Sequence, residues 1–261
     1  MIDVKLTDAD IFVRSSTSKG TQKKYVKDGY WYKLNKLGYE NIAEYLCSFV
    51  LECSNCKKYV SYEICKVNGK SACRSYDFLK PGQEFVTFQN LYEQYYGIKL
   101  TDKVMEFREI SERIAYTLEF VKKVTKLDLT EYLKTILTLD MLCLNEDRHF
   151  DNLGVLYSIK DNVFTEAPVF DNGLSLCSDY GTYPLDEEIE EIVTKVTALP
   201  FSGSFELQAA AIGFGLKIDY QMLYRKLDAL ESEEYFSRNR AIKMLRYQLD
   251  RYRKVLSKDE S

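Results

Sequence analysis

The chain has 261 residues, of which 46% are hydrophobic and 29% are charged, as in ordinary globular proteins and unlike disordered ones. Its formal net charge of −4 argues against nucleic-acid binding driven by bulk electrostatics. No apolar segment is long enough to span a membrane, and the N-terminal "MIDVKLTDAD" lacks the features of a secretion signal. We therefore expect a cytoplasmic protein that binds neither a membrane nor nucleic acid directly.

The seven Cys residues raise the question of a metal site. Cys53 and Cys56 form a C-x-x-C pair, and Cys65 and Cys73 follow, so four thiolates around zinc are one interpretation. A second C-x-x-C is missing, and the two later Cys residues lie in segments that resemble strands. We favour reduced, buried or unused thiols, because nothing in the chain indicates an oxidising compartment.

The first third of the chain has the pattern of a small β-rich unit. Strands are predicted over 11–14 and 30–35, joined by the basic, hydroxyl-rich loop 15–29. Apolar residues at three- and four-residue spacing predict an amphipathic helix over 40–54. Residues 58–79 read as a hairpin, since the Asn68-Gly69 pair accepts the positive φ angles of a tight turn.

The remainder is predicted to be mainly helical. One helix is expected over 101–124, and a second, apolar on all sides and hence buried, over 129–144. A second hairpin follows over 153–170, and residues 186–257 return to helical patterns. We place the boundary near residue 80, with an N-terminal lobe over 1–79 and a C-terminal lobe over 80–261.

The segment "LNEDRHFDNLGVL", residues 144–156, concentrates polar residues between the buried helix and the second hairpin. Asp147 and Asn152 lie five residues apart there, and the second strand of the hairpin leads to Asp171 in "FDNG". Phosphoryl transfer to a hydroxyl requires a carboxylate near the nucleophile and oxygen ligands for magnesium. The order of these three residues fits that chemistry, although Asp and Asn also serve as helix caps and turn formers.

"NEDRHFDNLGVL" together with "PVFDNG" resembles the catalytic segment of the HipA-like serine/threonine kinases, which are related to protein and phosphoinositide kinases. The resemblance implies an α+β, two-lobed protein kinase-like fold, with a small β-rich N-lobe and a larger helical C-lobe carrying a catalytic hairpin. It also implies ATP and Mg²⁺ as cofactors, Asp147 as the catalytic base, and Asn152 and Asp171 as metal ligands. The motif residues that would shape the loop are Asn145, Arg148 and His149.

The N-terminal part resembles the nucleotide-binding half of the same family. "STSKGTQKKY" is similar to its phosphate-binding loop, in which exposed backbone N–H groups and lysines contact phosphate. The residues assigned to that loop are Ser18, Gly20, Gln22 and Lys24. Lys33 on the next strand would pair with phosphate, and Glu44 on the first helix would be its ion-pair partner. A solvated strand edge and a surface helix position are the simpler alternatives.

The connector between the lobes, "RSYDFL", lies where a kinase hinge offers backbone groups to adenine. We therefore place Tyr76, Asp77 and Phe78 near the base, with an ordinary connector as the alternative. Glu146 and Asp151 receive no role and are expected to face solvent.

The resemblance implies a compact Ser/Thr protein kinase without the extra N-terminal subdomain of full-length family members. The substrate of this kinase would be a protein of unknown identity. If the kinase is a toxin, it would bind an antitoxin-like partner. If it is an effector, it would leave the cell without a classical signal peptide. Autophosphorylation is expected on the phosphate loop, at one of Ser15, Ser16, Thr17 or Ser18. A nucleotide-binding pseudokinase and a small-molecule or lipid kinase are the alternatives.

Overall fold

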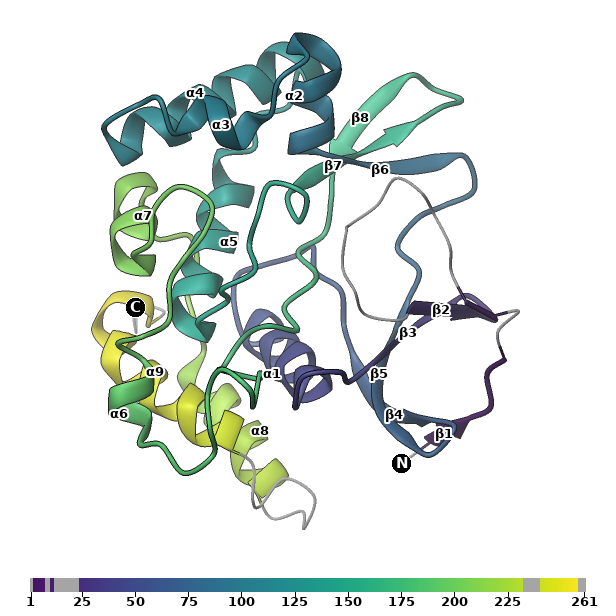
Figure 1. The fold of residues 1–261 in the computed structure, drawn as a ribbon, viewed down its shortest axis with the longest axis vertical. Coiled ribbons are helices and arrows are strands. Elements are labelled where there is room, and N and C mark those ends of the chain that lie inside the picture. The colour runs from purple at the N-terminus through teal and green to yellow at the C-terminus, as the bar shows by residue number, and fades with distance from the viewer. Residues whose placement is uncertain (1, 8–9, 12–23, 232–239, 258–261) are drawn as a thin grey trace.

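A computed structural model describes residues 2–7, 10–11, 24–231 and 240–257. Figure 1 shows two unequal lobes, with the small sheet of strands β1 to β5 on one side and most of the helices on the other. The mixed α+β class and the two-lobed arrangement predicted from the sequence are confirmed.

The sheet of the small lobe has the strand order β1-β4-β5-β3-β2. Its neighbours are antiparallel except for β1, which runs parallel to β4. Two tight turns, at Asp28-Gly29 and Asn68-Gly69, have both central residues at positive φ, which suits the right-handed twist of the flanking strands. The strands are β1 (Ile2–Val4), β2 (Lys24–Lys27), β3 (Tyr30–Leu34), β4 (Glu63–Val67) and β5 (Lys70–Tyr76).

Helix α1 (Glu40–Glu52) connects the small sheet to the helical lobe. It packs against β4 and β5 on one side and against α8 (Tyr220–Glu231) and α9 (Arg240–Leu256) on the other. Leu46, Cys47 and Val50 have no exposed surface and belong to the main hydrophobic core. Because α1 is buried from both sides, its position sets the relation between the two lobes.

The large lobe contains a second sheet, of order β6-β7-β8, and the remaining helices. Helix α5 is central, packing against α7 and α9, and ten of its residues are buried. The elements are β6 (Gln83–Thr87), α2 (Phe88–Tyr96), α3 (Leu100–Val104), α4 (Ile110–Thr125), α5 (Thr130–Cys143), β7 (Gly154–Ser158), β8 (Val163–Glu166), α6 (Ile189–Ile192) and α7 (Phe205–Ile212).

Most elements predicted from the sequence are present in the structure. Four observed elements were not predicted, and one predicted helix is two helices in the structure. The first helix, the buried helix 129–144 and both hairpins are confirmed. β1, β2, β6 and α2 were not predicted, and the helix expected over 101–124 is two helices, α3 and α4. Of the strand expected over 11–14, only Ile11 lies in the described part, where it forms a bridge with Tyr25.

The cysteines considered for a zinc site do not converge. Cys53, Cys65 and Cys73 are each at most 1% exposed and belong to three different hydrophobic clusters. Over the described ranges, no group of three or more His, Cys, Asp and Glu side chains is arranged to hold a metal ion. None of the helices in the same ranges is both long and apolar enough to cross a membrane.

Candidate active site

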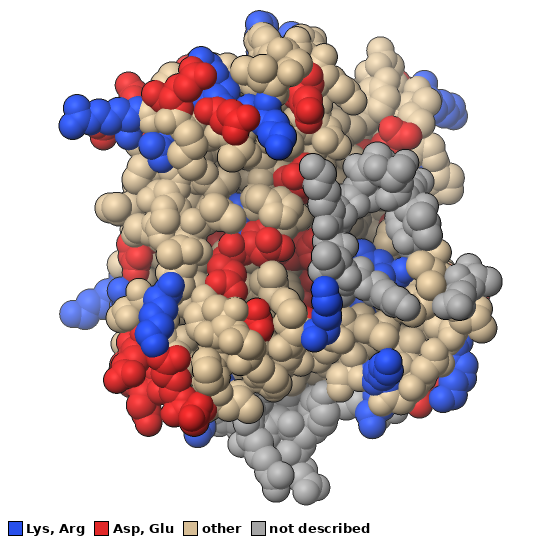
Figure 2. Space-filling model, in the orientation of Figure 1, with Lys and Arg blue, Asp and Glu red and all other residues tan. Residues whose placement is uncertain are grey.

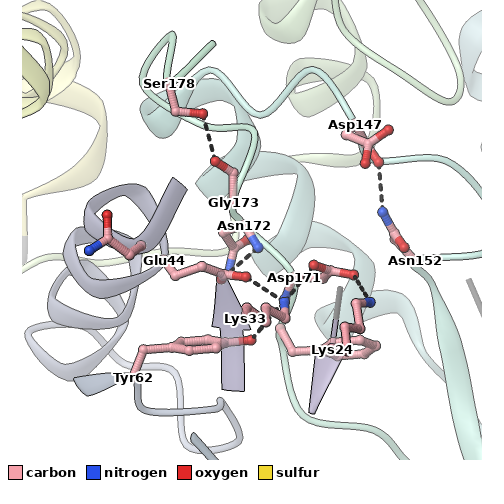
Figure 3. Close-up of polar contacts among 12 residues, drawn as sticks. Lys24, Lys33, Glu44, Tyr62, Asp147, Asn152, Asp171, Asn172, Gly173 and Ser178 are labelled. Carbon is pink, nitrogen blue, oxygen red and sulfur yellow. Dashed lines mark hydrogen bonds and ion pairs between the residues drawn. The ribbon is translucent and has the colours of Figure 1, made fainter. Parts of the chain in front are cut away.

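Lys33 lies at the centre of a buried ionic cluster between the lobes (Figure 3). Its Nζ is 2.6 Å from Oε1 of Glu44 on α1 and 2.6 Å from Oδ1 of Asp171. The hydroxyl of Tyr62 is also close, at 3.5 Å from the same nitrogen. Lys33 is 8% exposed and Glu44 is 1% exposed, so the cluster is shielded from water and its charges interact strongly.

Strand alternation explains why Lys33 points to this site. Tyr32, its neighbour in β3, belongs to the hydrophobic cluster on one face of the sheet, so Lys33 projects from the other face. On β2, Lys24 is the register partner of Lys33, and its Nζ lies 3.8 Å from Oδ2 of Asp171. The hairpin therefore presents two lysines on one face to the same carboxylate.

Asp171 adopts a left-handed backbone conformation, with φ of 60°, that short polar residues tolerate best after Gly. Burial alone would raise the pKa of its carboxyl, but Lys33 and Lys24 outweigh burial and hold that pKa well below its usual range. Burial would lower the pKa of Lys33, while Asp171 and Glu44 raise it well above its usual value. Both groups are thus charged at neutral pH.

The candidate catalytic loop, residues 144–153, begins where α5 ends, at Leu144 with φ of 55°. Nδ2 of Asn152 donates to the backbone carbonyl of Asp147 at 2.8 Å, and Oδ1 of Asn145 accepts from the backbone N–H of Asp147 at 3.2 Å. These bonds close the loop upon itself. Since the amide nitrogen of Asn152 faces Asp147, its amide oxygen points away from that carbonyl (Figure 3).

Arg148 is fully buried and joins the catalytic loop to the segment around Asp171. Its guanidinium pairs with Asp140 on α5, which is also fully buried, at 3.0 Å. It donates to Oδ1 of Asn172 at 2.6 Å and to the carbonyl of Phe170 at 3.0 Å. Arg148 therefore holds the residues on both sides of Asp171. The interpretation of this motif residue as loop-shaping agrees with these contacts.

Asp147 is more exposed than Asp151 of the same loop, with side chains 46% and 31% exposed. Partial burial raises the pKa of its carboxyl above the usual value, His149 opposes that shift, and the negative charge of Asp171 adds to it. Nε2 of His149 lies 3.7 Å from Oδ1 of Asp147, and its Nδ1 lies 3.8 Å from Oδ2 of Asp151. The only His of the chain thus sits between two carboxylates.

The predicted hinge residues separate in the structure. Tyr76 is 67% exposed and stacks on Tyr30, and these register partners lie on the sheet face opposite Lys33. Asp77 accepts from the backbone N–H of Leu79. Only Phe78 turns toward the site, where its ring contacts that of Phe170 at 5.1 Å between centroids. A role of the hinge backbone toward adenine stays a prediction.

The structure therefore brings together six of the residues predicted for the site: Lys24, Lys33, Glu44, Asp147, Asn152 and Asp171. The phosphate-loop residues Ser18, Gly20 and Gln22, like the modification candidates from Ser15 to Ser18, lie outside the described residues.

The expectation that Glu146 faces solvent is wrong. Its side chain is half-buried, and its Oε2 accepts a hydrogen bond from the hydroxyl of Tyr183 at 2.5 Å. A partner from far along the chain has no signature in the local pattern. Asp151 is partly exposed, and the hydroxyl of Thr87 lies 3.4 Å from its Oδ1.

Three contributors were missed from the sequence: Tyr62, Asp140 and Asn172. Tyr62 precedes a strand and Asp140 lies inside an apolar helix, so neither has a local motif. The position of an Asp in a predicted buried helix did carry a signal, because a buried carboxylate needs a cationic partner. Lys134 and Arg148, six and eight residues away, were the nearest candidates in sequence. Asn172 stands beside Asp171 in "FDNG".

Acidic side chains are prominent on the face of the molecule that Figure 2 draws. Figure 2 shows one group of them at the centre of the helical lobe and another over α6, where the exposed carboxylates are Asp186, Glu188, Glu190 and Glu191. Such a surface favours cationic over anionic partners.

Comparison with solved structures identifies the fold. No protein-family model matches the chain, and no curated protein matches it by sequence. Among solved structures, the proinflammatory kinase CtkA of Helicobacter pylori superposes with a TM-score of 0.64 and 16% identity, over 98% of this chain and 94% of that one. The chain has the fold of a HipA-like kinase. HipA of the Shewanella oneidensis MR-1 toxin–antitoxin system, solved with HipB and operator DNA, superposes with a TM-score of 0.51 and 14% identity, over 92% of this chain and 63% of that one.

Proposed function

We propose that this protein is an ATP- and Mg²⁺-dependent kinase that transfers the γ-phosphoryl group to a Ser or Thr hydroxyl of another protein. The observation that carries the proposal is the buried pairing of Lys33 with both Glu44 and Asp171. A lysine held by a helix carboxylate beside a second carboxylate is the arrangement that positions phosphates and their magnesium in protein kinases.

The residues at the site fit both ATP and Mg²⁺, the two cofactors that the resemblance implies. Lys24 and Lys33 direct two cations toward one space beside Asp171, where a polyphosphate would be neutralised. Asp171 offers a carboxylate that stays ionised at neutral pH, and Asn152 offers an amide oxygen, so both supply the hard oxygen ligands that Mg²⁺ prefers. Bound there, Mg²⁺ would neutralise charge on the phosphates.

Asp147 would perform the proton chemistry. The substrate hydroxyl oxygen forms a bond to the γ-phosphorus, the bond from that phosphorus to the bridging oxygen of ADP breaks, and the hydroxyl proton passes to the Asp147 carboxylate. Partial exposure of Asp147 leaves it accessible to a substrate side chain. Asn152 fixes the loop beneath it through its bond to the Asp147 carbonyl.

In addition to the protein substrate, the proposed binding partner of this chain is an antitoxin-like protein. Its support is the fold shared with HipA, which was solved together with HipB and operator DNA. The low identity to both kinases means that substrate choice must be established on this chain itself.

The test is transfer of labelled phosphate from ATP by the purified protein, with and without Mg²⁺, beside Asp147→Asn and Asp171→Asn. Mg²⁺-dependent transfer to Ser or Thr that both substitutions abolish would support the proposal. Binding of ATP and Mg²⁺ in a thermal-shift assay without transfer would support the pseudokinase alternative. Transfer only to small hydroxyl compounds or lipids would refute the protein-kinase assignment.

A further inference from the structure

The segment 172–180, which follows Asp171, touches helix α1 at two separate points. In the second turn of the helix, Oε2 of Glu44 accepts from the backbone N–H of Asn172 at 2.8 Å. At the start of the helix, the backbone N–H of Tyr39 donates to the carbonyl of Ser178 at 3.1 Å. The hydroxyl of Tyr39 donates to the carbonyl of Leu176 at 2.5 Å. One segment therefore holds both the beginning of α1 and its ion-pairing carboxylate.

The same segment is anchored to the helical lobe. The backbone N–H of Leu176 donates to the carbonyl of Cys143 at the end of α5, at 2.7 Å, and the carbonyl of Leu174 accepts from the backbone N–H of Glu146 at 3.3 Å. The Asn172 side chain is held by Arg148. Cys143, Leu176 and Asn172 are buried, Leu174 and Glu146 are half-buried, and most contacts use backbone atoms. The segment is therefore a fixed connection between α1 and the loop that follows α5.

Gly38 makes the close approach at the start of α1 possible. It forms a β-bridge with Asp179, and a Cβ atom added at Gly38 would overlap the carbonyl oxygen of Ser178. That oxygen cannot move freely, since it accepts the Tyr39 N–H. Only glycine can occupy this position without displacing the backbone contact. The requirement is steric, because the φ of Gly38 is not among the positive values.

We propose that the segment 172–180 holds α1 in the position that pairs Glu44 with Lys33, and that Gly38 and Tyr39 are positioning residues for the proposed kinase site. Neither residue contacts the lysine. They act by fixing the helix that carries Glu44, so the ion pair is assembled by the fold itself, through backbone contacts. The effect on catalysis rests on the proposed function, but the effect on Lys33 does not.

The test compares wild type with Gly38→Ala, Tyr39→Phe and Gly203→Ala. Gly203 is the matched control, because a Cβ there meets no atom within 4 Å and its φ is not positive. Two readouts are measured well below the melting temperature of each variant. The first is the kcat and KM for ATP-dependent transfer. The second is the rate at which Lys33 undergoes reductive methylation by formaldehyde and a borane, followed by mass spectrometry of its peptide.

Lys33 of the wild type should be protected from methylation by burial and ion pairing. In Gly38→Ala we expect Lys33 to react at least tenfold faster and kcat to fall at least tenfold, while Gly203→Ala behaves as wild type. Tyr39→Phe keeps the ring and loses the hydroxyl, with its hydrogen bonds to the Leu176 carbonyl and with the Arg240 side chain. It should shift both readouts the same way by a smaller factor. It carries the test alone if Gly38→Ala fails to fold.

If Lys33 is methylated as slowly in Gly38→Ala and Tyr39→Phe as in wild type, the inference is overturned. Absence of transfer by the wild type would instead refute the proposed function, and the methylation rates would still decide whether the segment holds α1. Faster methylation with unchanged kcat would show that the contact exists but does not position the site, which contradicts the proposal.

Discussion

Replacing Arg148 by Met should destabilise the protein by about 3–5 kcal/mol, the range for breaking a buried ion pair by removing one partner. Arg148 and Asp140 both have no exposed surface, so the substitution leaves a buried carboxylate without its cation. It also removes the donor to Asn172 and to the carbonyl of Phe170. For a chain of this size, the melting temperature should fall by roughly 10 °C.

The loss should depend on pH. Burial raises the pKa of Asp140, and Arg148 opposes that shift, so the pKa in the folded variant rises further above its unfolded value. The folded variant then binds a proton that the unfolded chain does not hold at the same pH, and it regains stability as pH falls through the raised pKa. The destabilisation should therefore be larger at pH 8 than at pH 5.

The assay is urea unfolding at both pH values, followed by circular dichroism and by the fluorescence of Trp31, the only Trp of the chain. Coincident transitions would justify a two-state free energy. Lys122→Met is the control, because Lys122 pairs with Asp128 where both side chains are 61% exposed, and it should cost less than about 1 kcal/mol. A loss below about 1 kcal/mol for Arg148→Met, or an equal loss at both pH values, would refute the reasoning.

Three further predictions concern the site and its support. Lys33→Met removes the cation shared by two carboxylates, so the thermal shift produced by ATP and Mg²⁺ should disappear; an undiminished shift would contradict the assigned role. The pKa of Asp147 is raised above its usual value, and only the ionised carboxylate can accept the proton. The value of kcat/KM should therefore fall as pH drops through that raised pKa. A profile of kcat/KM that stays flat down to the usual pKa of Asp would contradict the role of Asp147 as base. Gly154→Ala places a Cβ 2.5 Å from the carbonyl oxygen of Val86, so urea unfolding should show a loss of about 1–3 kcal/mol, whereas Gly203→Ala should be near neutral.

Local patterns predicted the elements whose signal lies within a short window. The Asn68-Gly69 turn and the apolar periodicity of α1 and α5 needed no information from elsewhere in the chain. Strand β2 was missed because the basic loop was extended through residue 29, although Asp28-Gly29 is the same kind of turn signal as Asn68-Gly69. Strand β1 has three residues and pairs in parallel with β4, a partner that no local pattern reveals.

The break between α3 and α4 shows how apolar periodicity can mislead. The apolar stripe continues across residues 105–109, yet α4 begins with a capping box formed by Glu109 and Glu112. A Glu side chain that accepts from the N3 backbone is a less common start signal than Ser or Thr. The periodic pattern therefore concealed a helix start.

The residues that meet at the candidate site were predictable where a local motif contains them and unpredictable where only tertiary contacts bring them together. Asp147, Asn152 and Asp171 follow from spacing and context, and Lys33 and Glu44 follow from the order of elements. The contacts of Asn172 with Glu44 and Arg148 depend on the packing of distant segments, which sequence spacing does not encode. Tyr76 was placed near adenine from its position in the connector, but strand alternation puts its side chain on the other face.

The most direct test of the central claim is the rate of ATP- and Mg²⁺-dependent phosphoryl transfer by Asp147→Asn measured beside Asp151→Asn. Both substitutions remove one negative charge from the same loop and flank the same His149, so they differ mainly in the role assigned to Asp147. Asp147→Asn should lower kcat about 10²- to 10⁴-fold, and Asp151→Asn should stay close to wild type. Equal rates for the two variants, or near wild-type transfer by Asp147→Asn, would contradict the account.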